Sequence, residues 1–100
     1  MSAKRQKVSE EDARGGDSLH VLGSVVFDIL FSPKSLPTPG TTVLSENVKK
    51  APGGKGANQA YAAGKVLSSS SSTSSVSFFG CVGEDEFGAK SLESLQSVGV

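Results

Sequence analysis

The run Gly53-Gly54-Lys55-Gly56-Ala57-Asn58 is the part of this 100-residue sequence best suited to hold a polar ligand. Two glycines directly before a helix let the backbone approach a ligand without interference from a Cβ atom, and the free N–H groups of the first helical turn point toward it. Hydroxyl oxygens or an anion suit such a site. The run lacks the Ser or Thr that follows Lys in a P-loop, and Gln59 stands where the dinucleotide motif needs glycine. A glycine-rich turn that merely starts a helix remains the alternative.

Asp28 is the second residue that could do chemistry. It follows the first predicted strand, and ligand sites of open α/β sheets gather at the carboxyl ends of strands. A carboxylate at that position can accept hydrogen bonds from two hydroxyl groups. Read alone, Asp28 could also be a turn or cap residue. His20 and Cys81 have no partner at metal-ligand spacing, so we expect a half-buried strand histidine and a buried core thiol.

Two buried strands are predicted beside these residues. The runs Leu19 to Val26 and Val76 to Val82 are almost continuously apolar and rich in β-branched or aromatic residues, which is typical of strands buried on both faces. The first run stays extended through Leu30. Prolines at 33, 37 and 39 then forbid a helix and predict a turning connection. Loose alternation from Thr41 to Val48 predicts the exposed strands of a small flap.

Two helices are predicted after the flap. Small or apolar residues recur at helical spacing from Ala57 to Leu67, and their small size would let a helix lie close to a sheet. A second amphipathic helix is expected from Phe87 to Val98, with Asp85 as its N-cap and Gly99 as its stop.

Strands that alternate with helices imply an α/β fold with a parallel sheet. Two core strands cannot cover both faces and both edges of such a sheet, so we expect this chain to be the first third of a larger α/β domain. Residues 1–18 have the composition of a disordered tail, and the serine tract 68–75 that of a flexible surface loop. The remaining length is near the size at which folding alone becomes marginal.

Charge and hydropathy exclude several classes of protein. Ten Lys and Arg residues balance ten Asp and Glu residues, whereas a nucleic-acid binder needs a basic surplus. No apolar run approaches the ~20 residues that span a bilayer, and the N-terminus lacks the apolar core of a signal peptide. We therefore expect a cytoplasmic protein. The short basic cluster at residues 4–7 leaves the nucleus open, although a solvated tail is the simpler interpretation.

Four motifs together resemble the N-terminal portion of the ribokinase family of carbohydrate kinases, also called the PfkB family. The resemblance runs from about Leu19 to Val100. The glycine run is closest to that of ribokinases proper, and the last motif is shared more widely across the family. The motifs are Leu22-Gly23-Ser24 leading to Asp28, Leu36-Pro37-Thr38-Pro39-Gly40, Gly53-Gly54-Lys55-Gly56-Ala57-Asn58-Gln59-Ala60, and Gly80-Cys81-Val82-Gly83-Glu84-Asp85-Glu86-Phe87-Gly88.

The resemblance implies the N-terminal part of a doubly wound α/β sheet, with a small β lid over a sugar. It implies transfer of the ATP γ-phosphoryl group to the 5-hydroxyl of D-ribose, with Mg²⁺ and with K⁺ as a stimulating monovalent cation. Lids of this family often also form a homodimer contact. The positions that the resemblance carries over as sugar-binding residues are Asp28, Gly53, Gly54, Lys55 and Asn58.

Two departures from the family pattern limit this interpretation. Ribokinases usually place Asn two residues before the aspartate, and this chain has Val26, which leaves another sugar or nucleoside kinase as an alternative. The family's catalytic aspartate lies in a Gly-Ala-Gly-Asp motif that does not occur here, and the nucleotide and cation sites belong to the same later region. We therefore expect a fragment that is inactive on its own. A non-catalytic remnant that acts only in protein interaction is the remaining alternative.

Overall fold

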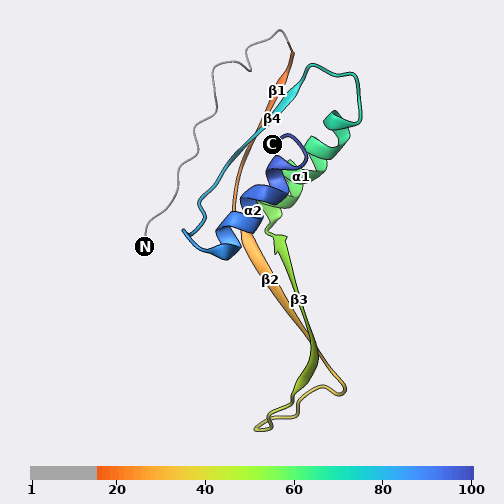
Figure 1. Cartoon of the computed structure of the whole chain (residues 1–100), viewed down its shortest axis with the longest axis vertical. Coiled ribbons are helices and arrows are strands. Elements are labelled where there is room, and N and C mark those ends of the chain that lie inside the picture. Colours follow the sequence, from red (N-terminus) through yellow and green to blue (C-terminus); the bar gives the residue numbers. More distant parts are fainter. Residues whose placement is uncertain (1–15) are drawn as a thin grey trace.

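The computed structural model describes residues 16–100, which form a small α/β body and a long two-stranded ribbon (Figure 1). The tail predicted over residues 1–18 therefore lies almost entirely outside the described residues, and Ser18 already belongs to a strand. No helix within residues 16–100 is long and apolar enough to cross a membrane. The elements in chain order are β1 (Ser18–Leu22), β2 (Val26–Pro33), β3 (Ser45–Gly53), α1 (Lys55–Ser68), β4 (Ser75–Phe79) and α2 (Glu86–Gln96).

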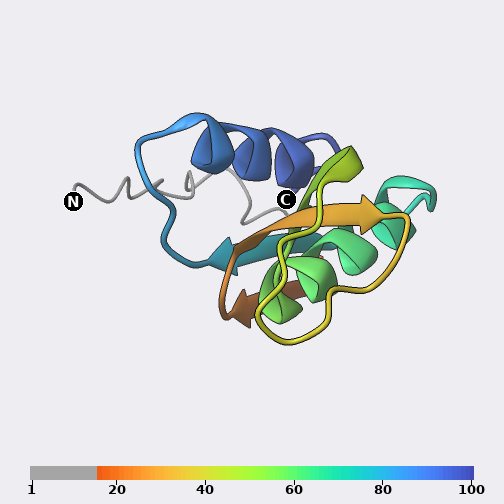
Figure 2. The same cartoon turned by 90° about the horizontal axis from the view of Figure 1, so that it is seen from below.

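The body is built on the parallel pair β1 and β4, which lie side by side when seen from below (Figure 2). Their register runs from Ser18 opposite Ser75 to Leu22 opposite Phe79. Helix α1 contacts both strands, and α2 lies beside α1. This arrangement confirms the predicted α/β class and the parallel pairing, because a crossover long enough to return the chain in parallel needs a helix between the strands.

Helix α1 packs through small residues, as its sequence predicts. Ala57, Ala60 and Gly64 are buried, and Ala60 has no exposed surface. Ala60 forms a cluster with Val76 of β4 and Leu95 of α2, so the helix, the sheet and the second helix share one core. The core is modest because these side chains are small, and burial of apolar area is what stabilises it.

Two glycines approach each other closely where β1 ends and α1 begins. A Cβ atom on Gly56, in the first turn of α1, would lie 2.7 Å from Gly23 Cα, just after β1. The amide N–H of Ala57 donates to the carbonyl of Ser24 at 3.3 Å across the same contact. Backbone therefore packs on backbone here, which only glycine permits.

Both ends of α2 follow the sequence prediction. Asp85 caps the first turn by accepting a hydrogen bond from the amide of Gly88 at 2.8 Å. At the other end the amide of Val100 donates to Leu95 and that of Gly99 donates to Gln96, which is the Schellman arrangement. Gly99 adopts the positive φ of 78° that this arrangement requires.

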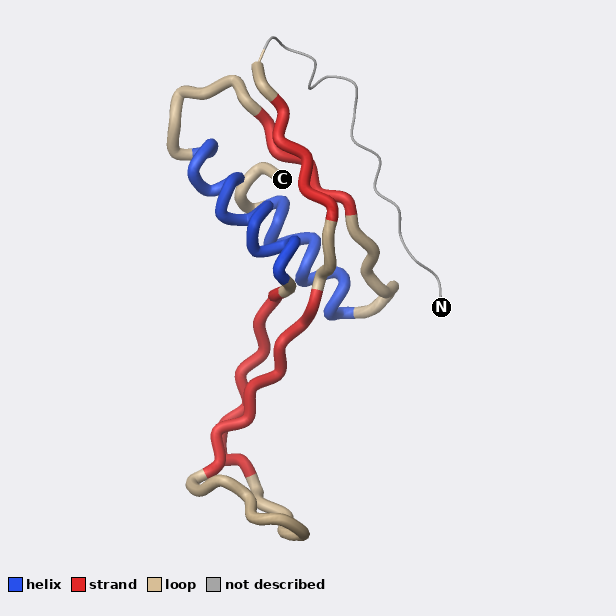
Figure 3. The backbone as a smooth tube through the Cα atoms, turned by 180° about the vertical axis from the view of Figure 1, so that it is seen from behind, coloured by secondary structure: helices blue, strands red, loops and turns tan. Residues whose placement is uncertain are grey.

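Strands β2 and β3 form an antiparallel ribbon, residues 26–53, that extends away from the helices (Figures 1 and 3). It corresponds to the predicted flap, but its boundaries differ from the prediction. Residues Thr41 to Leu44 belong to the loop, while β3 continues past Val48 as far as Gly53. The loose alternation in the sequence stops at Val48, so the sequence does not predict the second half of this strand.

Three other predictions about the strands and loops were wrong in part. The predicted strand Leu19 to Val26 is interrupted at residues 23–25 and divides into β1 and the start of β2. It is not buried on both faces: Leu19 is 48% exposed and Leu22 is 85% exposed. Cys81 is exposed rather than a core thiol, because β4 ends at Phe79. The serine loop is shorter than predicted, since Ser68 belongs to α1 and Ser75 to β4.

We predict that Gly56→Ala destabilises the full-length protein. The new Cβ atom would meet Gly23 backbone atoms that cannot swing aside. Overpacking of this kind costs about 1–3 kcal/mol, against a gain of about 1 kcal/mol in helix propensity. We expect denaturant unfolding to show a net loss of about 1 kcal/mol, the middle of the resulting range, and of no more than about 2 kcal/mol. Gln59→Ala, at an exposed position in the same helix, is the control and should change the unfolding free energy little; equal stability of the two variants would contradict the packing argument.

We also predict that residues 1–100 produced alone bind a hydrophobic dye and associate. Large apolar side chains on β1, β4 and the ribbon are exposed, among them Leu22, Phe31 and Phe79. Unpaired strand edges and contiguous apolar surface favour association. Dye fluorescence and light scattering during heating are the measurements. A soluble monomer that melts in one cooperative transition without binding the dye would contradict this expectation.

Candidate functional site

The candidate residues lie at one junction, where β3 ends, α1 begins and the chain passes from β1 into β2. Gly53 is the last residue of β3, Gly54 is the N-cap of α1, and Lys55 is its first residue. The turn at residues 23–25 packs against this point through the contact between Gly23 and Gly56. The glycine run is therefore a helix start, as its plainest interpretation proposed, and it is also the place where four segments meet.

Gly54 has a backbone conformation that suits only glycine. Its φ is 99°, and an added Cβ atom would lie 2.6 Å from the Ser24 carbonyl oxygen and 2.7 Å from the Val26 nitrogen. No side chain caps this helix start. Within residues 16–100 the amides of Ala57 and Asn58 have acceptors, whereas those of Lys55 and Gly56 have none. Two first-turn N–H groups therefore have no acceptor within these residues; Gly56 is buried, whereas Lys55 is exposed.

The carboxylate of Asp28 lies directly against Gly53. Asp28 pairs with Ala51 in the ribbon, and its Oδ2 occupies the space that a Cβ atom on Gly53 would need. The residue is exposed, and no hydrogen bond or ion pair to its carboxylate forms within residues 16–100. An exposed carboxylate held against a glycine backbone can accept hydrogen bonds from ligand hydroxyls. The structure thus brings Asp28 and Gly53 together.

Asn58 lies near Gly53 in the first turn of α1. Both residues line a cleft of about 170 Å³ between α1, α2 and the base of the ribbon. Tyr61, Ser91 and Ser94 add polar groups to its wall. Gly53 is therefore close to both residues: it lines the same cleft as Asn58, and it directly contacts Asp28. The amide of Asn58 can donate as well as accept, which complements an acceptor-only carboxylate.

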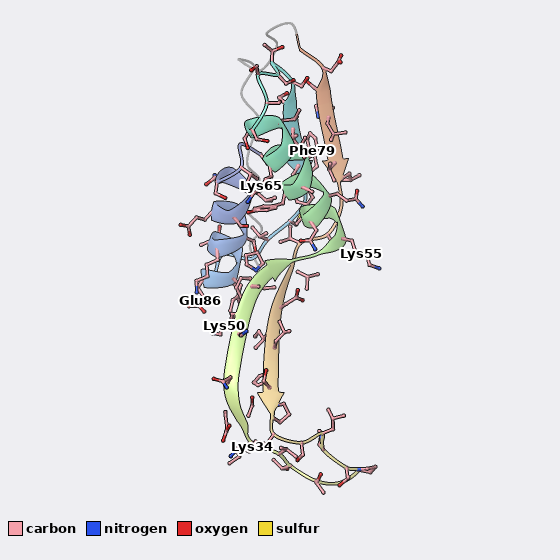
Figure 4. The ribbon with its side chains drawn as sticks, turned by 90° about the vertical axis from the view of Figure 1, so that its right-hand side faces the viewer. Lys34, Lys50, Lys55, Lys65, Phe79 and Glu86 are labelled. Atoms are coloured by element: carbon pink, nitrogen blue, oxygen red, sulfur yellow. The ribbon has the colours of Figure 1, made fainter. Side chains whose placement is uncertain are left out.

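Lys55 belongs to the junction by its backbone but not by its side chain. The side chain is exposed and points away from the helices (Figure 4). It does not line the cleft that Asn58 faces. Within residues 16–100 no group of three or more His, Cys, Asp or Glu side chains could hold a metal ion. The chemistry that these residues support is recognition of polar groups by one carboxylate, one amide and backbone N–H groups.

Several residues of the junction could not be identified from the sequence by looking for reactive or ligand-binding residue types. Ser24 contributes only its carbonyl oxygen and Gly23 only its lack of a side chain, so neither has a distinctive residue type. Tyr61, Ser91 and Ser94 reach the cleft from two helices that are far apart in the sequence. Helical spacing could have placed each one on its helix, but not the two helices beside each other.

Comparison with known proteins assigns the family. A model of the pfkB family of carbohydrate kinases matches residues 17–100. The chain belongs to the pfkB family. Ribokinase of Schizosaccharomyces pombe is 40% identical to this pfkB chain over 82 residues, which cover 80% of the chain and 25% of that protein. Deoxyribokinase of Salmonella typhi is 35% identical over 80 residues, which cover 80% of the chain and 24% of that protein.

A solved structure supports the same fold. Ribokinase from Cryptococcus neoformans, in a complex with ADP, superposes with a TM-score of 0.60 at 31% identity. The match covers 84% of this pfkB chain and 24% of that one. The chain thus spans about a quarter of the length of the relatives it matches. The predicted partial ribokinase-like α/β fold is confirmed.

Proposed function

We propose that this pfkB chain is the sugar-binding part of a ribokinase-type kinase, which transfers the ATP γ-phosphoryl group to the 5-hydroxyl of D-ribose. The observation that carries the proposal is the position of the Asp28 carboxylate against Gly53, the residue directly before the uncapped start of α1. The match to ribokinases over most of the chain supports it.

The residues of this chain would bind and orient the sugar. The two oxygens of Asp28 would accept hydrogen bonds from neighbouring hydroxyls, as a carboxylate with exposed lone pairs can. Gly53 and Gly54 would let the sugar lie against the backbone, and the Asn58 amide would pair with a further hydroxyl. Holding the sugar in one orientation presents a single hydroxyl for reaction, which lowers the entropic part of the barrier. Lys55 would stay at the edge of the site, where its charge favours anionic groups nearby.

ATP, Mg²⁺ and K⁺ belong to the proposal as substrate and cations. Residues 16–100 offer no cluster of metal-ligating side chains, so we assign no cation site and no catalytic residue within them. The proposed contribution of this chain is limited to the sugar side of the reaction. The ADP complex of the Cryptococcus neoformans ribokinase supports a nucleotide as the second substrate.

The exposed apolar surface of the ribbon is an argument for a second copy of this protein as a binding partner. Its two strands expose Ile29, Leu30, Phe31 and Val48, which are large apolar side chains. An exposed apolar surface of this kind is characteristic of an interaction site. We propose that the ribbon forms a homodimer contact as well as covering the sugar.

Val26 favours a second candidate substrate. In the ribbon register Val26 lies opposite Gly53 and two residues from Asp28, so it shares the face that carries the carboxylate. Its side chain is 47% exposed and apolar, and it would leave a nearby sugar hydroxyl without a partner. A sugar that lacks that hydroxyl would fit better. The match to a deoxyribokinase makes 2-deoxyribose the sharpest alternative, ahead of a nucleoside.

Asp28→Ala and Asn58→Ala should each impair use of the sugar. Loss of hydrogen bonds to the charged Asp28 costs about 1.5–3 kcal/mol, which corresponds to a roughly ten- to hundredfold fall in kcat/KM for the sugar. Loss of a hydrogen bond to the neutral Asn58 amide costs about 0.5–1.5 kcal/mol, a roughly two- to tenfold fall. The KM for ATP should stay within about twofold. Steady-state kinetics of the full-length protein, with sugar and ATP varied separately, is the measurement. Gln59→Ala, beside Asn58 on the same helix, is the matched control. An unchanged kcat/KM for the sugar in both variants would refute the site assignment.

Val26→Asn should shift the preference between two sugars. If the missing amide limits ribose binding, the new side chain should improve kcat/KM for ribose relative to 2-deoxyribose by roughly tenfold, because an unpaired hydroxyl costs about 1–3 kcal/mol. Val26→Leu keeps the position apolar and should leave the ratio unchanged. Competition between the two sugars in one assay measures it. A ratio that does not move in Val26→Asn would show that this position does not face the sugar.

A further inference from the structure

The ribbon must be held at a defined angle if Asp28 is to act at the junction. Beyond its base, the ribbon extends away from the body (Figures 1 and 3). Asp28 belongs to the ribbon, whereas Gly54, Lys55 and Asn58 belong to the start of α1. A rotation of the ribbon would therefore move the Asp28 carboxylate relative to these three residues. The binding residues themselves do not prevent such a rotation, so a contact elsewhere must hold the ribbon in place.

The two faces of the ribbon base are occupied differently. Phe27 and Asp28 are consecutive in β2, so their side chains point to opposite faces. Phe27 pairs with Pro52, and Lys50 of β3 pairs with Ile29, which places Phe27 and Lys50 on one shared face. Asp28 is on the other. The face that carries Phe27 and Lys50 is turned toward α2.

Both strands of the ribbon contact the first turn of α2. The Phe27 ring lies with its centroid 4.7 Å from that of Phe87. Lys50 Nζ lies 5.4 Å from the centroid of the same Phe87 ring and 3.7 Å from Glu86 Oε1. Figure 4 shows Lys50 and Glu86 near each other, on the side away from Lys55. Phe87 thus contacts one residue of each strand, Phe27 of β2 and Lys50 of β3.

The contacts are unequal in strength. The Lys50 and Glu86 side chains are 46% and 61% exposed, and exposed ion pairs of this kind contribute little. The Phe27 and Phe87 rings, tilted by 34°, are less weakened by solvent because both side chains are half-buried and their contact removes apolar surface from water. The Lys50 cation over the Phe87 face adds a smaller contribution, as cation–π contacts at exposed sites do. The aromatic side chain of Phe87 therefore dominates, and Lys50 supports it.

Phe87 is itself rigidly anchored. The Asp85 carboxylate accepts a hydrogen bond from the Gly88 amide on one side of it. The Ser91 hydroxyl donates to the Phe87 carbonyl at 2.9 Å one turn later. A Cβ atom on Gly88 would collide with the Gly83 carbonyl oxygen, so the turn before α2 is packed tightly against its first residues. The Gly-x-Val-Gly-x-Asp-x-Phe-Gly motif thus holds Phe87 in one place.

We propose that Phe87, with Lys50 as its second contact, is a positioning residue that braces the ribbon so that Asp28 faces the glycine turn. Phe87 does not touch the sugar. It acts through Phe27, whose neighbour in β2 is Asp28, and it gives a physical role to a motif to which the proposed chemistry assigns none. This inference rests on the proposed function for its effect on sugar binding, but not for its effect on the ribbon.

The test compares Phe87→Leu and Lys50→Met in the full-length protein. If the brace is lost, the ribbon holds Asp28 correctly only part of the time, and the apparent affinity for the sugar falls by that fraction. We expect the sugar KM to rise roughly three- to tenfold in Phe87→Leu and less in Lys50→Met. The KM for ATP and the kcat should remain within about twofold. Because both residues contact one ring, the double variant should be no worse than Phe87→Leu alone.

Conservative variants and amide exchange separate positioning from simple destabilisation. Phe87→Tyr and Lys50→Arg keep the ring and the cation and should restore the sugar KM, while Glu86→Gln should change it little because the ion pair is exposed. Hydrogen–deuterium exchange should accelerate in β2 and β3 of Phe87→Leu and stay unchanged in β4 and α1.

Two results would overturn the proposal. One is an unchanged sugar KM together with unchanged exchange in the ribbon of Phe87→Leu. The other is a uniform rise of exchange across the body, with the KM values for both substrates raised, which would make Phe87 an ordinary structural residue. If the unaltered protein phosphorylates no sugar, the proposed function fails, and exchange alone then decides: faster exchange confined to the ribbon supports the brace, and unchanged exchange refutes it.

Discussion

The direct backbone contact between Gly23 and Gly56 is the constraint on which the rest of this structure depends. It brings the end of β1 against the first turn of α1 with no side chain between them. Only at that separation can the Ala57 amide donate to Ser24, and only then does the N-cap glycine, Gly54, lie within reach of Val26. The start of the ribbon and the start of the helix are therefore joined at one point, and the candidate site is built around that point.

In the proposed site, one face of the ribbon recognises the sugar and the other face supports the ribbon. Because side chains alternate along a strand, Phe27 can pack on Phe87 while its neighbour Asp28 remains open beside Gly53. Neither role would be served by a helix at this position, whose neighbouring side chains are not directed to opposite sides. The contacts of Phe87 and Lys50 explain how the ribbon is held.

Local patterns predicted the two helices, the caps of α2 and the parallel pairing of β1 with β4, since each depends on residues close in sequence or on the few connections that can join such elements. The candidate residues were also found from the sequence, because their motifs resemble those of the pfkB family. The predictions about burial were less successful. Leu19 and Cys81 have an apolar pattern typical of a core, yet both are exposed, since the body within residues 16–100 has only two strands to bury them. Apolar character shows which residues could be buried, and the covering layers decide which ones are.

By itself, the sequence determined where α2 begins and ends, because its cap and its glycine stop act through bonds between near neighbours such as Asp85 and Gly88. It also determined that Gly53, Gly54 and Asn58 stand at a helix start, through residue type and order alone. Only the tertiary structure decided that Asp28 rests against Gly53 and that Phe27 rests against Phe87. Those contacts join residues 25 and 60 positions apart, and their geometry follows from the register of the ribbon and the close packing of two glycines, neither of which any local pattern encodes.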